Sequence, residues 1–177
     1  MAPGLLDLNI WGEYTLKLFV AMLLSGVVGI ERQRRRKTAG MRTHMLVCLG
    51  SLIFTLLGMD LFARGSAGAG VGGVTRVDPL RIVEAIVGGL GFLGAGAIIQ
   101  ARGAIHGLTT ATSIWTMGAL GVAVGIGNYP LALLTTLFSY LVLSTVDIFE
   151  KKWVRKLEDR YEARKSLRKN SKHDSLP

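Results

Sequence analysis

Five apolar blocks run through the chain, and no other feature limits its possible folds so strongly. Each block is about 20 residues long, the length at which an α-helix crosses a hydrocarbon core roughly 30 Å thick. In a soluble domain, apolar residues would instead alternate with polar ones at the period of a helix or a strand. The sequence therefore predicts an all-α, polytopic membrane helix bundle. The expected spans are residues 11–30, 44–63, 80–100, 109–126 and 130–149.

The pattern divides the chain into a transmembrane domain at 11–149 and a basic tail at 150–177. Positive charge gathers in this tail and in the segment 31–42. Cytoplasmic loops carry an excess of Lys and Arg, so we expect both regions inside the cell and the N-terminus outside. An odd number of spans agrees with this orientation. The basic residues left in the transmembrane domain on the outer side are Lys17, Arg64, Arg76 and Arg81.

The net charge of +9 could by itself indicate a nucleic-acid partner. The basic residues lie beside apolar blocks, however, where they orient the chain and meet anionic lipid headgroups. Once the spans are removed, no soluble module for DNA or RNA remains. We therefore expect the lipid bilayer, and no nucleic acid, as a partner.

Within the blocks, polar and small residues recur at steps of three or four, so each set occupies one helix face. Such residues let helix backbones approach closely in lipid, which favours helix packing as their role. The stripe of the first block is Lys17, Ala21, Ser25 and Gly29. That of the second block is His44, Cys48, Ser51, Thr55 and Gly58. The fourth block has two stripes, Thr109, Thr112, Thr116, Ala119 and Ala123, and Gly118, Gly121 and Gly125.

The third block combines a stripe of this kind with charge. The stripe consists of Arg81, Glu84, Gly88, Gly91 and Ala95. Because an ionised group against lipid is costly, we expect Arg81 and Glu84 to face the bundle. They could pair with each other or serve a ligand or ion. We also expect helix packing at the small residues of this block, which are Gly88, Gly91, Gly94, Ala95 and Gly96.

Ionisable residues lie toward the ends of the predicted spans, which argues against a proton-coupled carrier with titratable groups at mid-membrane. Those toward the outer side form a candidate ion or polar site. They are Asp60, Asp78, Arg81 and Glu84. Magnesium takes oxygen ligands and keeps several waters, so an oligomer could hold it with a ring of Glu84 or Asp60. No spacing of His or Cys indicates a transition metal.

A second candidate site lies toward the cytoplasmic ends of the spans. It consists of Glu31, Arg32, Arg42, Thr43, His44, Thr109 and Thr110. Thr109 or Thr110 could cap the fourth helix, whose N-terminus carries partial positive charge. Glu31 could pair with that end or with Arg42. Two interpretations stay open: the cluster binds an anion or a partner's acidic group, or it ties the helix ends together.

Residues 89–94 spell GxGxxG, the dinucleotide fingerprint. That fingerprint needs a strand, a tight turn and a helix N-terminus, and here it lies inside a predicted span. No nucleophile–base pair, HExxH motif or GxxxxGK[ST] loop is visible. We therefore expect no catalytic residues, no cofactor and no enzymatic activity.

Several segments together resemble the membrane domain of the MgtC/SapB family, over about residues 16–146. They are GIERQ at 29–33, AGMRTH at 39–44 followed by LVCLGS, DPLRI at 78–82, GLGFLGAG at 89–96, and GLTTATSIW at 107–115 followed by GVAVGIG. The resemblance implies a multi-pass protein of the bacterial inner membrane. Long family members carry a soluble C-terminal domain of ACT-like type. With its basic tail, this chain is similar to the short SapB-like members.

The resemblance also implies a link to magnesium homeostasis and to adaptation to low magnesium, and in pathogens to virulence and survival inside macrophages. Roles that it implies include control of membrane potential and of ATP synthase through contacts within the membrane. We therefore expect a regulatory membrane partner that acts on a protein such as ATP synthase, with a homo-oligomer as a further possibility. The alternative is an oligomeric channel or transporter for Mg²⁺ or another ion. Mg²⁺ would be a sensed or transported ion.

Overall fold

The computed structural model describes residues 8–67, 78–101 and 104–146. The chain divides into two compact units, Met1–Tyr140 and Leu141–Pro177. All helix packing discussed for this protein belongs to the first unit. The predicted tail at 150–177 and the end of the fifth block lie outside the described residues.

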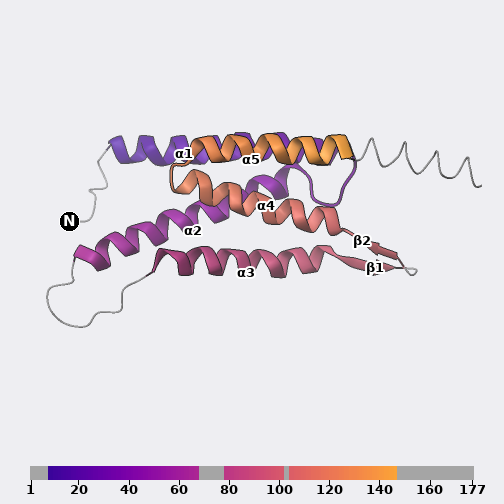
Figure 1. Cartoon of the computed structure of the whole chain (residues 1–177). Helices are drawn as coiled ribbons and strands as arrows, with labels where there is room; N and C mark the ends of the chain where they lie inside the picture. The colour runs from indigo at the N-terminus through magenta and orange to yellow at the C-terminus, as the bar shows by residue number, and fades with distance from the viewer. Residues whose placement is uncertain (1–7, 68–77, 102–103, 147–177) are drawn as a thin grey trace, which may run out of the picture. The chain divides into compact units, whose positions relative to one another are not determined.

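Five α-helices make up most of the described chain, and each falls on one of the apolar blocks (Figure 1). The prediction of an all-α bundle is confirmed. Four of the helices are long and apolar enough to cross a membrane, and the fifth, with the turn that follows it, is a shorter apolar helix. The helices are α1 (Leu8–Arg34), α2 (Met41–Ala67), α3 (Pro79–Ala97), α4 (Leu108–Gly125) and α5 (Tyr129–Leu141), followed by the π-helical turn η1 (Val142–Val146).

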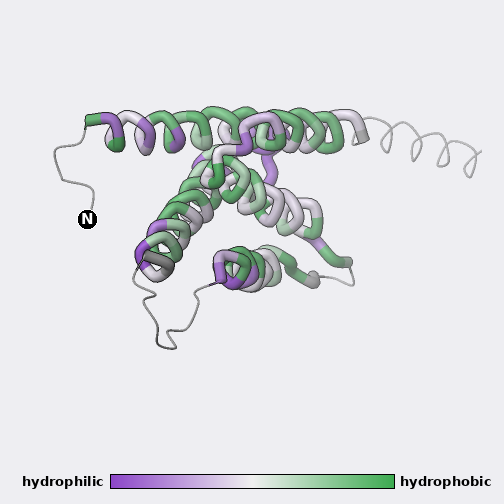
Figure 2. The backbone as a smooth tube through the Cα atoms, turned by 60° about the vertical axis from the view of Figure 1, so that its left-hand side comes forward, coloured by the Kyte–Doolittle hydropathy of each residue, from purple (hydrophilic) through white to green (hydrophobic). Residues whose placement is uncertain are grey.

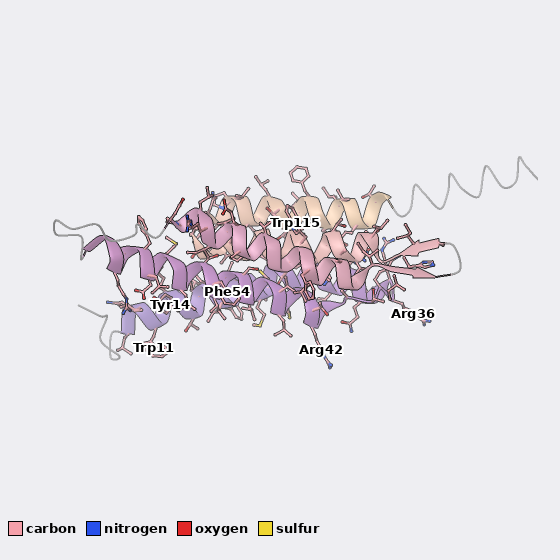
Figure 3. The ribbon with its side chains drawn as sticks, turned by 90° about the horizontal axis from the view of Figure 1, so that it is seen from below. Trp11, Tyr14, Arg36, Arg42, Phe54 and Trp115 are labelled. Atoms are coloured by element: carbon pink, nitrogen blue, oxygen red, sulfur yellow. The ribbon has the colours of Figure 1, made fainter. Side chains whose placement is uncertain are left out.

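The surface of the bundle is apolar, as contact with lipid requires. Large hydrophobic side chains such as Leu46, Phe54 and Phe92 are exposed, and hydrophobic residues dominate the helices in Figure 2. Trp11 lies near the start of α1 and Arg36 at the opposite end of the bundle (Figure 3). Tryptophan is typical of the boundaries of a membrane-spanning bundle, and arginine of its cytoplasmic loops.

Short-range interactions fix where α3 and α4 begin. Asp78 caps α3, because its Oδ1 accepts a hydrogen bond at 2.9 Å from the amide two residues on. Pro79 follows in the first turn, where an amide proton has no helical acceptor. α4 begins after Gly107, whose φ of 90° favours glycine. The expectation that Thr109 or Thr110 caps α4 is therefore wrong, since both lie within its first turn.

Between α3 and α4 the chain forms a two-stranded antiparallel hairpin, which the apolar blocks did not predict. β1 (Ile99–Ala101) pairs with β2 (Ala104–His106), and Ile99 lies opposite His106. Strands of three residues are too short to produce a recognisable alternation of apolar and polar residues. The hairpin brings the end of α3 beside the start of α4.

α2 packs most extensively against α4 and α1. α3 lies against α4 and, less extensively, against α2, on the side away from α1 (Figure 1). The core forms where α1, α2 and α4 meet. Its fully buried apolar side chains include Val28, Leu52, Met117, Leu120 and Val124.

The small and polar stripes on α1 and α2 face this core. All members of the α2 stripe are buried, as are the three small members of the α1 stripe. On α4, Gly121 and Gly125 face α2 and Gly118 lies against both α3 and α2, whereas the stripe residues Thr109, Thr112 and Ala119 are exposed. A Cβ atom on Gly121 would collide with the carbonyl oxygen of Cys48. The two helix backbones are therefore in direct contact, as small residues permit.

Candidate functional site

Polar side chains from three segments meet where α1 ends and α4 begins, at what we term the inner end, following the predicted orientation. Arg32, near the end of α1, is only 2% exposed. Its Nη2 donates a hydrogen bond to Oγ1 of Thr110 in α4, at 2.8 Å. The hydroxyl of Thr38, in the loop before α2, donates to the same oxygen at 3.3 Å. A hydrogen bond from a guanidinium is stronger than one between neutral groups, so Arg32 links α1 firmly to α4.

His44 forms a second polar link, between α2 and α4, and is completely buried. Its Nδ1 lies 2.8 Å from the carbonyl oxygen of Gly40, and its Nε2 lies 3.2 Å from Oγ of Ser113. Because a carbonyl oxygen can only accept, Nδ1 carries a proton. The hydroxyl of Ser113 donates a hydrogen bond to the carbonyl oxygen of Thr110 at 2.8 Å, so both links meet on one turn of α4. The inner polar cluster therefore consists of Arg32, Thr38, His44, Thr110 and Ser113.

The residues predicted for the inner site only partly coincide with this cluster. Arg42 and Thr109 are exposed, Thr43 is half-buried, and Arg42 points away from the bundle (Figure 3). Glu31 forms an ion pair with Arg35, directly after the end of α1, where Arg42 or the start of α4 had been expected as its partner. The predicted residues that the structure brings together are Arg32, His44 and Thr110.

Two members of the inner polar cluster were missed from the sequence. Ser113 follows Thr110 by three residues, and this spacing could have placed it on the same face. Thr38 lies in a loop, where helical periodicity gives no guidance. The bonds of the cluster run between elements of the same chain, and they favour the interpretation that it ties the helix ends together.

The residues predicted for the outer site are not gathered into one site. Asp60 pairs with Arg64 on its own helix, at 2.8 Å, and the carboxylate of Asp78 caps α3. Arg81 and Glu84 are both exposed on α3. Over the described parts of the chain, no three His, Cys, Asp or Glu side chains approach closely enough to hold a metal ion.

The expectation that Arg81 and Glu84 face the bundle is wrong for Glu84, because α3 turns a different face inward, while Arg81 is exposed at the edge of a groove between α2 and α3. Ile86, Leu90 and Gly94 are buried, and a Cβ atom on Gly94 would contact Ala111 of α4. These residues are four apart and share one face, nearly opposite the charged stripe. Branched aliphatic side chains make many more van der Waals contacts than glycines, which decides which face packs.

The small residues of α3 consequently remain open, apart from Gly94. A Cβ atom at Gly88, Gly91 or Gly96 would meet nothing within 4 Å, and Ala95 is exposed. Their predicted role in packing is therefore not met within this chain. We refer to the exposed set of Glu84, Gly88, Gly91 and Ala95 as the outer face of α3.

Comparison with known proteins decides the family. The model of the MgtC family matches residues 18–152, which contain most of α1 and all of α2 to α5. The chain belongs to the MgtC family. The resemblance seen in the sequence motifs is thus confirmed.

The MgtC-family relatives are bacterial. YhiD from Escherichia coli strain K12 is 36% identical over 88% of this chain and 69% of its own length. SrpB from Synechococcus elongatus is 36% identical over 85% of this chain and 84% of its own length. MgtC from Salmonella typhimurium is 39% identical over 70% of this chain, but the match spans only 48% of that protein. No solved structure matches this chain.

Together, the family and the helices fix the location of the chain. It is a multi-pass bacterial membrane protein, and the described part of the chain has four helices suited to membrane spans. Within the family match lie the inner polar cluster, the outer face of α3, and Arg81.

Proposed function

We propose that this MgtC-family protein is a regulatory membrane protein linked to magnesium homeostasis, which acts by contacting other proteins within the bilayer. The name of its relative YhiD proposes a magnesium transporter, and the extent of that match supports a shared link to magnesium. Regulation by contact requires an exposed binding surface, whereas transport requires a polar path through the protein. The distribution of polar groups favours the first.

The outer face of α3 is the observation that carries this proposal. Glu84 lies exposed on a helix whose length and composition suit a membrane span. At the centre of a bilayer an ionised side chain costs about 2.5–3.5 kcal/mol on insertion scales, and less toward the ends. Beside it, Gly88 and Gly91 leave the helix backbone uncovered. Small residues with a polar neighbour are typical of surfaces that pack against another membrane helix.

The buried hydroxyl groups support the same conclusion. Ser25 donates to the carbonyl of Ala21 at 2.6 Å, and Thr55 donates to that of Ser51 at 2.7 Å. Each hydroxyl is thus satisfied by its own helix and needs neither water nor an ion as a partner. The interior of a single chain is better suited to holding helices together than to hydrating a moving ion.

A second candidate function is an ion channel formed by several copies of the chain. It is favoured by Glu84, because a ring of carboxylates would form wherever α3 helices surrounded a common axis. Such a ring suits a divalent cation with its waters. Flux of Mg²⁺ into proteoliposomes tests it: a channel requires flux from the wild type that Glu84→Gln abolishes. Wild-type protein without flux would remove this candidate.

The main test is purification of the tagged protein from native membranes of cells grown in low magnesium. We expect a membrane complex to co-purify, with ATP synthase as the partner that the family resemblance implies. Gly91→Leu places a branched side chain on the outer face of α3 and should reduce recovery of that complex several-fold. Gly89→Leu adds the same group elsewhere on α3 and serves as the control. Recovery of this protein alone, or equal effects of both variants, would contradict the proposal.

Growth provides an independent measurement. A deletion strain in low magnesium should be restored by the wild type and by Arg42→Ala, whose side chain is exposed outside the inner polar cluster. Glu84→Ala should fail to restore growth although it reaches the membrane in normal amounts. Full restoration by Glu84→Ala would mean that the outer face of α3 has no part in the physiology.

A further inference from the structure

Between α2 and α3 the bundle has an open groove of about 970 Å³. Ser51, Asp78 and Arg81 are the polar residues in its lining, and all other lining residues are apolar or glycine. Representative apolar positions are Leu46, Phe54 and Leu61 on α2, and Ala85, Gly89 and Leu93 on α3. Phe54 is labelled in Figure 3. The groove belongs to a different side of α3 from the outer face with Glu84.

The length and the lining of the groove indicate what can occupy it. Its α2 wall extends from Leu46 to Leu61, which is about 22 Å at 1.5 Å per residue. The groove is open along one side, and the chains of a phospholipid run in the same direction as membrane-spanning helices. Its length and its apolar lining therefore suit lipid chains.

The positive charge at one end of the groove indicates what kind of lipid headgroup would bind there. Arg81 lies in the first turn of α3, where an arginine can reach the membrane surface while its aliphatic part stays in apolar surroundings. Its guanidinium can bind a phosphate through two parallel hydrogen bonds. The carboxylate of Asp78 also lines the groove, but it accepts the capping bond of α3. The N-terminus of α3 adds partial positive charge at the same end.

We propose that the α2–α3 groove is a binding site for an anionic phospholipid, with its acyl chains along the apolar walls and its phosphate on Arg81. This inference does not depend on the proposed regulatory function, because it uses another side of α3. The groove would select a lipid for its negative headgroup and its hydrocarbon chains together. A free phosphate lacks the chains, and a neutral lipid lacks the charge.

Two glycines allow the groove to be filled without disturbing the packing of the bundle. A Cβ atom on Gly50 of α2 or on Gly89 of α3 would meet nothing within 4 Å, and both residues line the groove. Gly50→Leu and Gly89→Leu therefore place the same bulky group into it from opposite walls. Gly91→Leu is the matched control, because Gly91 also faces open space but is not in the groove lining.

The experiment uses the full chain, purified in mild detergent from vesicles of phosphatidylglycerol and phosphatidylcholine, with bound lipid counted by native mass spectrometry. We expect the wild type and Gly91→Leu to retain phosphatidylglycerol. Each groove variant should retain roughly tenfold less, which corresponds to about 1.4 kcal/mol. Helicity measured by circular dichroism verifies that each variant is folded. Because the two groove variants lie on opposite walls, each tests lipid binding independently of the other.

The charge is tested separately. Arg81→Gln should lose the preference for phosphatidylglycerol over phosphatidylcholine while it still binds lipid chains. Arg64→Gln, near the same end but outside the groove lining, should keep that preference. Displacement of the lipid by inorganic phosphate would show a plain anion site and overturn the proposal. Groove variants that retain as much lipid as the wild type would also overturn the proposal. The same holds if these variants change only the mass of a co-purified protein complex and not the amount of bound lipid.

Discussion

Replacing Gly121 by alanine adds one methyl group at the point where α4 crosses α2. That methyl group would collide with the carbonyl oxygen of Cys48 and lie 2.9 Å from Cβ of Ser51 and 3.0 Å from the backbone nitrogen of Leu52. These atoms belong to the backbone of α2 or are attached directly to it. They cannot rotate away as the end of a long side chain could, so the two helices must separate.

Two effects of opposite sign determine the change in stability. Alanine favours a helix over glycine by about 1 kcal/mol, whereas overpacking a well-filled core costs about 1–3 kcal/mol. Because the backbone itself must move, we expect the upper part of that range and a net destabilisation of about 1–2 kcal/mol. Gly91→Ala meets open space on α3, so only the favourable effect of about 1 kcal/mol applies there. The difference between the variants is then about 2–3 kcal/mol, or roughly 30- to 150-fold in the unfolding equilibrium.

Reversible unfolding in mixed detergent micelles measures this difference. Both variants are titrated with sodium dodecyl sulfate, and unfolding is followed by tryptophan fluorescence and by circular dichroism. Equal midpoints for the two variants would mean that α2 and α4 are not in backbone contact at Gly121. A more stable Gly121→Ala would refute the reasoning outright.

Three further predictions use the same unfolding assay. Arg32→Met removes the charged donor to the hydroxyl on α4 and should destabilise the protein by about 1.5–3 kcal/mol, whereas the exposed Arg36→Met should change little, and equal effects would contradict the link. Asp78→Ala removes the cap of α3 and should cost about 0.5–2 kcal/mol, against less than about 1 kcal/mol for Asp60→Ala in its exposed ion pair. His44→Leu removes the side-chain bonds to the carbonyl of Gly40 and the hydroxyl of Ser113, each of which keeps another partner, and should cost about 1 kcal/mol or more; a variant as stable as the wild type would mean that this histidine does not tie the helices.

Periodicity predicted the interior of α2 correctly because most of the polar and small residues of that block lie on one face. From His44 to Gly58 every polar or small residue at the predicted spacing is buried. Periodicity predicted the wrong inward face for α3, because two sets of residues satisfy the same helical spacing. Ile86 and Leu90 compete with the charged stripe, and no count of spacings says which of the two meets α4.

The inner polar cluster was predictable in part for a similar reason. Arg32, His44 and Thr110 were singled out by polarity at the ends of apolar blocks, but their mutual bonds depend on how the helices lie against one another. The ion pair of Glu31 with Arg35 illustrates this, since a partner four residues along the chain needs no tertiary contact. Loop residues such as Thr38, and strands as short as those of the hairpin, leave no periodic trace in the sequence.

Close contacts at two glycines hold α3 at both of its ends. A side chain on Gly107 would strike the carbonyl oxygen of Ala97, and one on Gly58 would strike the side chain of Ile82. The distance from α3 to its neighbours is consequently set at these two glycines, which lie outside the middle of the groove. Apolar side chains along the walls can therefore be exchanged for others of similar size without closing the space, so related chains could adapt it to different membranes while keeping one frame.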